Sequence, residues 1–175
     1  NCIFTLTDYC KNEKFDQELI NILNKNYKSI YFWVQGFEDY EYLKSLNKIE
    51  NIKCIFGLED YRELLIKGNI DYIGTRLHAG IYAMRHGVRS IIIAIDNRAR
   101  DMKESYNLPS IERNNISELT KIIDSSFETN IKIDIGTFFY IPYKTIDNNG
   151  LIKCIKPDKI EINGKKKVIN TYKLY

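Results

Sequence analysis

The sequence is short of the residues that mark fibrous and low-complexity chains, with only 9 glycines and 3 prolines among 175 residues. Its hydrophobic content of 44% is too high for a disordered chain and is enough for one sizeable core. No apolar run approaches the roughly 20 residues of a membrane span, and the longest strongly apolar stretch is Ile91 to Ile95. The composition therefore predicts an ordinary soluble globular chain without a membrane span.

Neither sign of charge dominates, because 26 Lys and Arg face 23 Asp and Glu and leave a formal net charge of +3. Acidic and basic residues are interspersed up to a basic triplet at Lys165, Lys166 and Lys167, which is typical of a solvated turn. Nucleic-acid binders usually carry a clustered basic stripe. No nucleic-acid partner is therefore expected.

The chain also lacks the patterns that announce a metal site or a secreted protein. It has no C-x-x-C pair and no zinc spacing among Cys2, Cys10, Cys54 and Cys154. Free cysteines in apolar stretches behave as small buried hydrophobes, so a reduced, cytoplasmic setting fits best. Nothing after Asn1 reads as a signal peptide. Because the first residue is not Met, we expect the chain to be a piece of a longer protein.

From residue 2 to about residue 125, short β-prone runs alternate with amphipathic helical stretches. The predicted strands are Cys2–Leu6, Ile30–Val34, Ile52–Phe56, Ile70–Ile73 and Ser90–Ile95. The predicted helices carry Phe15 to Leu23, Glu38 to Leu46, Glu59 to Lys67 and Arg76 to His86, and a last one is opened by a cap at Asn115 with Glu118. Such alternation implies right-handed crossovers, so we expect a Rossmann-like three-layer α/β domain with a mostly parallel sheet.

The pattern changes near the end of the chain. From Ile131 onward it turns β-rich and polar, and Asn163-Gly164 between Lys159–Ile162 and Lys165–Ile169 predicts a hairpin. We therefore divide the chain into a Rossmann-like domain over residues 1–130 and a β-rich extension over 131–175.

Two predicted loops at strand ends carry unusual side chains. In the first, Thr75 is a plausible helix N-cap, and Arg76, Leu77 and His78 then occupy the first helical turn. The free N–H groups and helix dipole make such a turn an anion site, whereas an Arg there is unfavourable by roughly 0.3–1 kcal/mol when the site is empty. Arg76 therefore either faces a bound phosphate or carboxylate, or points sideways to a nearby carboxylate. His78 is either a general acid beside the substrate or a histidine hydrogen-bonded within the loop.

The second loop follows the strand Ser90–Ile95. Arg98 can clamp an anion, and Asp96 or Asn97 can orient the arginine or a hydroxyl group. The next charged residues, Arg100 and Asp101, are interpreted as surface pairs.

Three weaker signals remain. Gln35 offers an amide at the end of another strand, where Gly36 permits close backbone approach. His86 falls in the last turn before Gly87 and is interpreted as a helix-capping residue. No P-loop or G-x-G-x-x-G fingerprint is present, so nucleotide binding by those routes is not supported. Neither histidine has an acid at ligand spacing, and no metal is expected.

Three segments together resemble the polysaccharide pyruvyl transferase family: Asp71-Tyr-Ile-Gly-Thr-Arg-Leu-His-Ala-Gly80, Arg89-Ser-Ile-Ile-Ile-Ala-Ile-Asp-Asn-Arg-Ala99 and Leu108-Pro-Ser-Ile-Glu-Arg113. The match covers the C-terminal half of the family, roughly residues 2 to 125 here. The resemblance implies one half of a GT-B-like fold of two Rossmann-type domains, with an N-terminal domain as partner. After about Ile131 the tail departs from the family pattern.

The resemblance also implies a reaction. Pyruvate would pass from phosphoenolpyruvate, a substrate and not a cofactor, onto two hydroxyls of a cell-surface glycan or its lipid-linked precursor, at a cytoplasmic or inner-membrane-facing location. Arg76, Leu77 and His78 would contact phosphoenolpyruvate, with Arg76 and His78 as the catalytic pair. Two other interpretations stay open: a glycosyltransferase half that uses a nucleotide sugar, and a non-catalytic interaction domain derived from such an enzyme.

Overall fold

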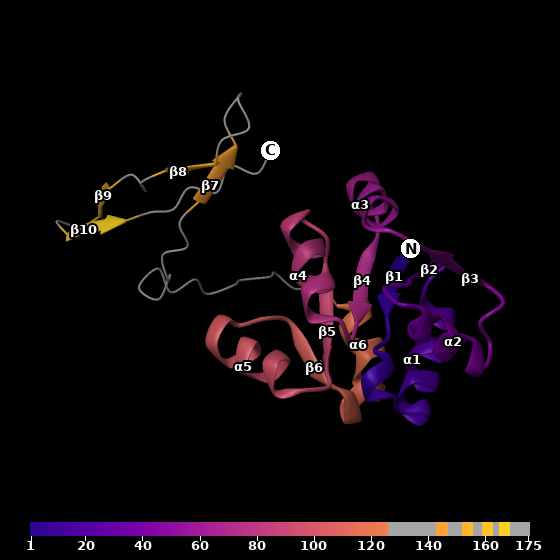
Figure 1. Cartoon of the computed structure of the whole chain (residues 1–175). Coiled ribbons are helices and arrows are strands. Elements are labelled where there is room, and N and C mark those ends of the chain that lie inside the picture. The colour runs from indigo at the N-terminus through magenta and orange to yellow at the C-terminus, as the bar shows by residue number, and fades with distance from the viewer. Residues whose placement is uncertain (126–142, 147–151, 156–158, 163–164, 169–175) are drawn as a thin grey trace. The chain divides into compact units, whose positions relative to one another are not determined.

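The computed structural model describes residues 1–125 and, in the tail, the backbone of residues 143–146, 152–155, 159–162 and 165–168. The chain divides into two compact units, Asn1–Ile133 and Asp134–Tyr175. Figure 1 shows the elements of both units, which we describe separately.

The first unit is built on a six-stranded sheet in which every pairing is parallel. The strand order is β3-β2-β1-β4-β5-β6. The strands are β1 (Cys2–Thr5), β2 (Ile30–Trp33), β3 (Ile52–Ile55), β4 (Asp71–Gly74), β5 (Ser90–Ala94) and β6 (Ser110–Glu112). The prediction of a Rossmann-like α/β fold with a parallel sheet is confirmed.

Helices cover both faces of the sheet, which gives three layers (Figure 1). One face packs against α1 (Glu13–Asn26), α2 (Phe37–Ser45) and α6 (Leu119–Asp124). The other face packs against α3 (Leu58–Lys67), α4 (Leu77–Arg85) and α5 (Asn97–Tyr106). Two short 3-10 helices, η1 (Asp8–Cys10) and η2 (Arg113–Glu118), follow β1 and β6.

The apolar strand β5 shows why the sheet is buried on both sides. Ile91 and Ile93 pack into the core under α1 and α6, whereas Ile92 and Ala94 pack into the core under α4. All four are at most 2% exposed. A strand that alternates between two cores must be apolar throughout, as its sequence is.

Helix α4 lies unusually close to the sheet, and Gly80 is the reason. A Cβ atom added at Gly80 would overlap Ile92 Cδ1 and come 2.8 Å from Tyr72 Cε1. The glycine therefore allows the helix that follows β4 to approach β4 and β5 closely, which fixes the start of α4 against the strand ends.

Two parts of the prediction are wrong in detail. The second predicted loop, which follows the strand Ser90–Ile95, is much shorter than expected. Asp96 caps helix α5, so residues 97–102 are already helical. The cap predicted at Asn115 with Glu118 does not form: Asn115 lies inside η2, and α6 begins at Leu119 without a side-chain cap. Directly after β6, Arg113 donates to both carboxylate oxygens of Asp16 in α1, at 2.6 and 2.5 Å.

The described parts of the second unit are two antiparallel strand pairs. Strand β7 (Tyr143–Ile146) pairs with β8 (Ile152–Ile155), and β9 (Lys159–Ile162) pairs with β10 (Lys165–Val168). The predicted turn residues Asn163 and Gly164 lie outside the described residues, as does most of the predicted extension. Among the described helices, none has the length and hydropathy needed to cross a lipid bilayer.

Candidate anion-binding site

The strand order places a crevice between β1 and β4. From β1 the chain moves outward through β2 and β3, and from β4 it moves the other way through β5 and β6. The loops after β1 and β4 therefore separate at the carboxyl edge of the sheet, which is where open α/β sheets bind their ligands.

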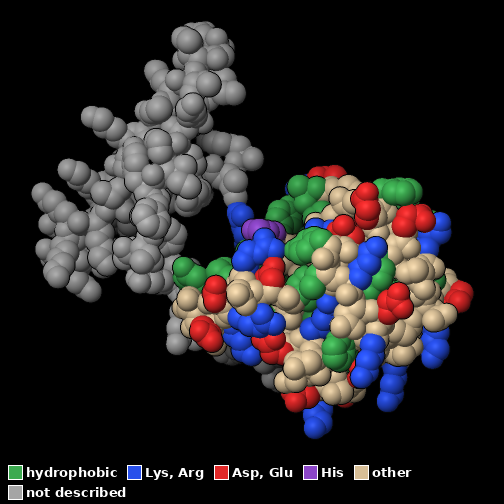
Figure 2. All heavy atoms as spheres, turned by 60° about the horizontal axis from the view of Figure 1, so that its bottom comes forward, with side chains coloured by type: hydrophobic (Ala, Val, Ile, Leu, Met, Phe, Trp, Pro, Cys, Tyr) green, Lys and Arg blue, Asp and Glu red, His purple; other side chains and the backbone are tan. Residues whose placement is uncertain are grey.

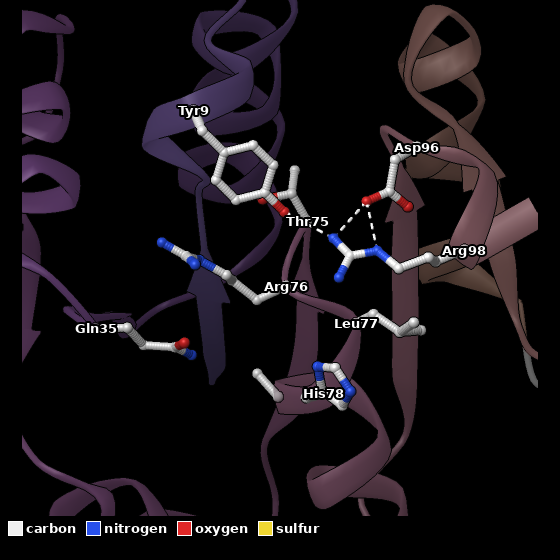
Figure 3. Close-up of a pocket in the computed structure, with 9 residues that line it drawn as sticks. Tyr9, Gln35, Thr75, Arg76, Leu77, His78, Asp96 and Arg98 are labelled. Atoms are coloured by element: carbon white, nitrogen blue, oxygen red, sulfur yellow. Dashed lines mark hydrogen bonds and ion pairs between the residues drawn. The ribbon is translucent and has the colours of Figure 1, made fainter.

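A pocket of about 370 Å³ lies at this edge. Figure 3 shows its lining, which comes from the segments after β1, β2, β4 and β5. The lining residues are Tyr9, Gln35, Thr75, Arg76, Leu77, His78, Ala79, Asp96 and Arg98. Seven predicted site residues are thus brought together, and the remaining two, Gly36 and Asn97, do not line the pocket.

The segment after β1 contributes residues that the sequence analysis missed. Tyr9 lines the pocket, and Asp8 contacts Arg76 through its carboxylate. Their signal was present in the sequence, since polar and aromatic residues follow the buried run Cys2–Leu6 directly. Open α/β sheets bind ligands beyond the carboxyl ends of their strands, and this holds for the end of β1 as it does for the ends of β4 and β5.

Buried hydroxyl groups lock the ends of β1 and β4 together beneath the pocket. Thr5 Oγ1 lies 2.6 Å from the Tyr72 hydroxyl, which donates to the carbonyl oxygen of Arg76 at 2.8 Å. Thr7 Oγ1 lies 2.7 Å from Thr75 Oγ1. Burial raises the pKa of Tyr72, so it stays a neutral hydroxyl over the whole physiological range. The floor of the pocket is therefore rigid and uncharged.

Thr75 is not the N-cap that the sequence predicted. Its hydroxyl group is hydrogen-bonded to the hydroxyl of Thr7 beneath the pocket. Helix α4 begins at Leu77, with Arg76 in the N-cap position. Arg76 provides no side-chain cap, so the first N–H groups of α4 lack that partner. Gly74 contributes to this geometry, because a Cβ there would come 2.7 Å from the backbone nitrogen of Thr5.

The guanidinium of Arg76 is held by nearby carboxylates, which is the second of the two interpretations that the sequence left open for this residue. Its Nη2 lies 2.7 Å from both carboxylate oxygens of Asp39 and 3.2 Å from Asp8 Oδ1. Its Nε donates to the carbonyl oxygen of Leu6 at 3.3 Å. The Tyr9 ring lies over the guanidinium, 5.8 Å from its central carbon. Arg76 lines the pocket with a side chain that is 24% exposed.

Asp39 is the buried member of this group. Its side chain is only 1% exposed, and it also accepts the backbone N–H of Asp8 at 3.2 Å. Burial raises the pKa of Asp39, and the contact with Arg76 opposes that rise. Asp39 thereby ties α2, the segment after β1 and Arg76 into one unit.

Arg98 lies at the other side of the pocket, and its side chain is more exposed to solvent than that of Arg76. Its Nε and Nη2 donate to Asp96 Oδ2 at 3.0 and 2.6 Å, and its Nη2 also donates to the Tyr9 hydroxyl at 3.0 Å (Figure 3). The side chain is 62% exposed. Partial burial tends to raise the pKa of Asp96, but Arg98 and the N–H of Ala99 outweigh it and hold that pKa below its usual value.

His78 and Leu77 line the pocket from the first turn of α4, and Gln35 lines it from the end of β2 (Figure 3). His78 is exposed. The other histidine, His86, is the C-cap of α4 with Nδ1 2.9 Å from the carbonyl oxygen of Tyr82, as the capping interpretation predicted.

Two predicted residues have other roles. The Oδ1 of Asn97 accepts from Arg100, which also pairs with Glu112, so Arg100 is the surface pair that was expected. Gly36 is the N-cap of α2, and a Cβ there would meet Glu38 Oε2 at 3.7 Å and Asp39 Oδ2 at 4.0 Å, which are ordinary contact distances. Packing within the domain therefore does not require a glycine at this position, and its close approach to a ligand stays a prediction.

The charges of the pocket belong to individual residues and not to a general basic surface. Figure 2 shows acidic and basic side chains interspersed over the face that it presents. Within the described residues, no group of three or more His, Cys, Asp or Glu is placed to hold a metal ion. Two arginines, a histidine and a helix start can together bind an anion and deliver a proton to it.

Comparison with known proteins adds no relative: no family model, curated protein or solved structure matches the chain.

Proposed function

We propose that this chain is the phosphoenolpyruvate-binding half of a pyruvyl transferase. One observation carries the proposal: Arg76, His78 and Arg98 line a single pocket at the switch point of a parallel sheet. These residues come from two separate segments of the motif that resembles the polysaccharide pyruvyl transferases. Phosphoenolpyruvate carries a phosphate and a carboxylate, which match two separate guanidinium groups.

The two arginines have different tasks in this proposal. Arg76 is fixed by Asp39 and Asp8 and supplies a stationary guanidinium beside the start of α4. Arg98 is exposed and can turn toward the ligand. A phosphate near the N–H groups of α4 also gains from the helix dipole.

The reaction then balances as follows. Protonated His78 gives its proton to the methylene carbon of phosphoenolpyruvate, and the carbon that bears the phosphate becomes electron-poor. A hydroxyl of the acceptor adds to that carbon and returns its proton to His78. The bond from this carbon to the phosphate oxygen breaks as the second hydroxyl adds, and the second hydroxyl proton leaves with the phosphate. The products are one cyclic ketal and one hydrogen phosphate.

The proposal also covers what lies beyond the described residues. The acceptor is a glycan or a lipid-linked sugar, and a second Rossmann-type domain completes a GT-B-like enzyme on the cytoplasmic side of the membrane.

Binding of phosphoenolpyruvate, measured by isothermal titration calorimetry, tests the donor site. Arg98→Ala should weaken binding by roughly tenfold or more, the loss expected for charge-assisted hydrogen bonds. Arg100→Ala is the matched control, because Arg100 lies on the same helix but pairs with Glu112 outside the pocket. Equal binding by both variants would contradict the proposed site. Binding of a nucleotide sugar without binding of phosphoenolpyruvate would favour a glycosyltransferase half instead.

In the complete enzyme, His78→Ala should abolish release of phosphate from phosphoenolpyruvate in the presence of acceptor, while phosphoenolpyruvate still binds. Wild-type turnover in that variant would remove His78 from its role as general acid.

A further inference from the structure

The two carboxylate oxygens of Asp96 have separate partners. Oδ1 accepts the backbone N–H of Ala99 at 3.3 Å and so caps helix α5. Oδ2 accepts both Nε and Nη2 of Arg98, at 3.0 and 2.6 Å. One side chain therefore starts a helix and occupies the guanidinium that faces the pocket.

The two arginine–carboxylate pairs of the pocket differ in how easily they can be exchanged. Asp39, which holds Arg76, is 1% exposed and also binds the backbone of Asp8. Asp96 and Arg98 are 32% and 62% exposed, and they lie two residues apart in sequence. An exposed pair of this kind contributes little stability and is open to competition from other ions. Arg98 is therefore the exchangeable cation of the site, and Arg76 is not.

We propose that Asp96 is an affinity-determining residue, which competes with the ligand for Arg98, so that an anion stronger than a single carboxylate recruits this arginine at the cost of the Asp96 pair. The inference rests on the proposed function, since it assumes that an anion binds in this pocket. On binding, Arg98 leaves Asp96 Oδ2 for the ligand, while Asp96 Oδ1 continues to cap α5. The Tyr9 hydroxyl, 3.0 Å from Arg98 Nη2, holds the arginine at the pocket during the exchange.

Asp96 thereby sets how tightly the site binds an anion. A monocarboxylate such as pyruvate offers Arg98 the same group that Asp96 already provides, so it gains little by the exchange. A phosphate carries up to two negative charges and three acceptor oxygens, and it offers more than Asp96 does. A phosphate-bearing ligand therefore displaces Asp96 and bears the cost of the exchange, whereas a simple carboxylate bears little of it.

The test is the variant Asp96→Asn. Asparagine caps helices about as well as aspartate, so α5 should keep its cap while Arg98 loses its internal anion. Inorganic phosphate should bind about two- to fivefold more tightly, in line with the small strength of an exposed pair. Pyruvate displaces Asp96 less completely and should gain less, so the ratio of the phosphate affinity to the pyruvate affinity should rise. Thermal unfolding checks that the fold is retained.

Two comparisons separate this exchange from a general effect of charge. Asp101→Asn removes an exposed acid further along the same helix and should leave both affinities unchanged. Asp96→Asn should also lose its advantage when Arg98 is replaced by Ala, because the gain passes through Arg98. A gain that persists without Arg98 would overturn the proposal, as would a gain for pyruvate that exceeds the gain for phosphate.

Failure of the proposed function gives a different result. If the wild-type chain binds neither phosphoenolpyruvate nor inorganic phosphate, the anion site itself is wrong. If the wild-type chain binds them and Asp96→Asn binds them no more tightly, the anion site stands and the role of Asp96 is refuted.

Discussion

Replacing Arg76 by Met should destabilise the domain through Asp39, and by an amount that depends on pH. The substitution keeps the aliphatic stem but removes the guanidinium whose Nη2 lies 2.7 Å from both oxygens of Asp39. Asp39 would remain 1% exposed in the wild-type geometry, with the N–H of Asp8 as its remaining charge-stabilising contact from the backbone. A buried carboxylate without a counter-charge is expensive.

The size of the effect follows from the burial of the pair. Breaking a fully buried pair by removing one partner costs about 3–5 kcal/mol. Because Arg76 is 24% exposed and the Asp8 N–H is retained, we expect about 2–3 kcal/mol at pH 7. For a chain of this size that loss lowers Tm by about 4–12 °C.

The sign of the pH dependence is opposite to that of an ordinary stabilising carboxylate. Burial already raises the pKa of Asp39, and Arg76 opposes that rise, so removing Arg76 raises this pKa further. A carboxyl group whose pKa is higher in the folded state destabilises the fold only when it is ionised. The deficit of Arg76→Met should therefore be full at pH 7 and shrink as the pH falls toward about 4, the ordinary pKa of aspartate.

Urea unfolding followed by fluorescence measures this effect, because the single tryptophan, Trp33, stacks on Tyr61 with ring centroids 3.9 Å apart. The double variant Arg76→Met with Asp39→Asn should recover most of the lost stability, since no buried charge remains. If the deficit is the same at pH 7 and pH 4.5, or if Asp39→Asn restores nothing, the reasoning about this pair is refuted. The double variant also separates folding from binding, because it should be folded and still bind phosphoenolpyruvate poorly.

Two further variants test the packing around the site by urea unfolding. Gly80→Ala should cost about 1–3 kcal/mol despite the better helix propensity of alanine, because its Cβ would overlap Ile92 and come 2.8 Å from Tyr72 Cε1; an unchanged midpoint would show that α4 can move off the sheet. Arg113→Met should cost about 2–4 kcal/mol, because it leaves Asp16, whose side chain is 3% exposed, without its guanidinium. Full stability in that variant would contradict the view that Arg113 anchors the segment after β6.

The general fold could be predicted from the sequence because the alternation of β-prone runs with amphipathic helices, and the apolar residues that each of them buries, are visible within short segments. Each β-prone run is short, each following helix is amphipathic, and the apolar run at Ser90–Ala94 fits a strand buried on both sides. What could not be predicted is where a helix begins next to a long-range contact. The sequence offered Thr75 as an N-cap, but its hydroxyl is used by Thr7, which lies 68 residues away.

The candidate site was predictable only in part, for a similar reason. Residues that follow strands β2, β4 and β5 could be assigned to one edge from topology alone, and seven of the nine predicted residues line the pocket. The partners of the arginines could not be assigned, because Asp39 is in a helix whose apolar pattern gives no sign of a buried acid. The choice between a free and a paired Arg76 depends on that one tertiary contact.

The segment from Asp71 to Gly80 contributes to stability at one edge of the sheet and to the pocket at the other, because strand β4 runs between the two edges. Asp71 begins β4 at the amino edge of the sheet, where its carboxylate binds the Tyr27 hydroxyl at 2.6 Å and the guanidinium of Arg89. Gly74, the other end of the same strand, lies about 10 Å further along the sheet at 3.3 Å per residue, and Arg76 follows beyond it. A substitution at Asp71 should therefore act on stability, and one at Arg76 on both stability and binding. Part of this motif therefore serves the scaffold, and only its residues at the carboxyl edge can contact a ligand in the pocket.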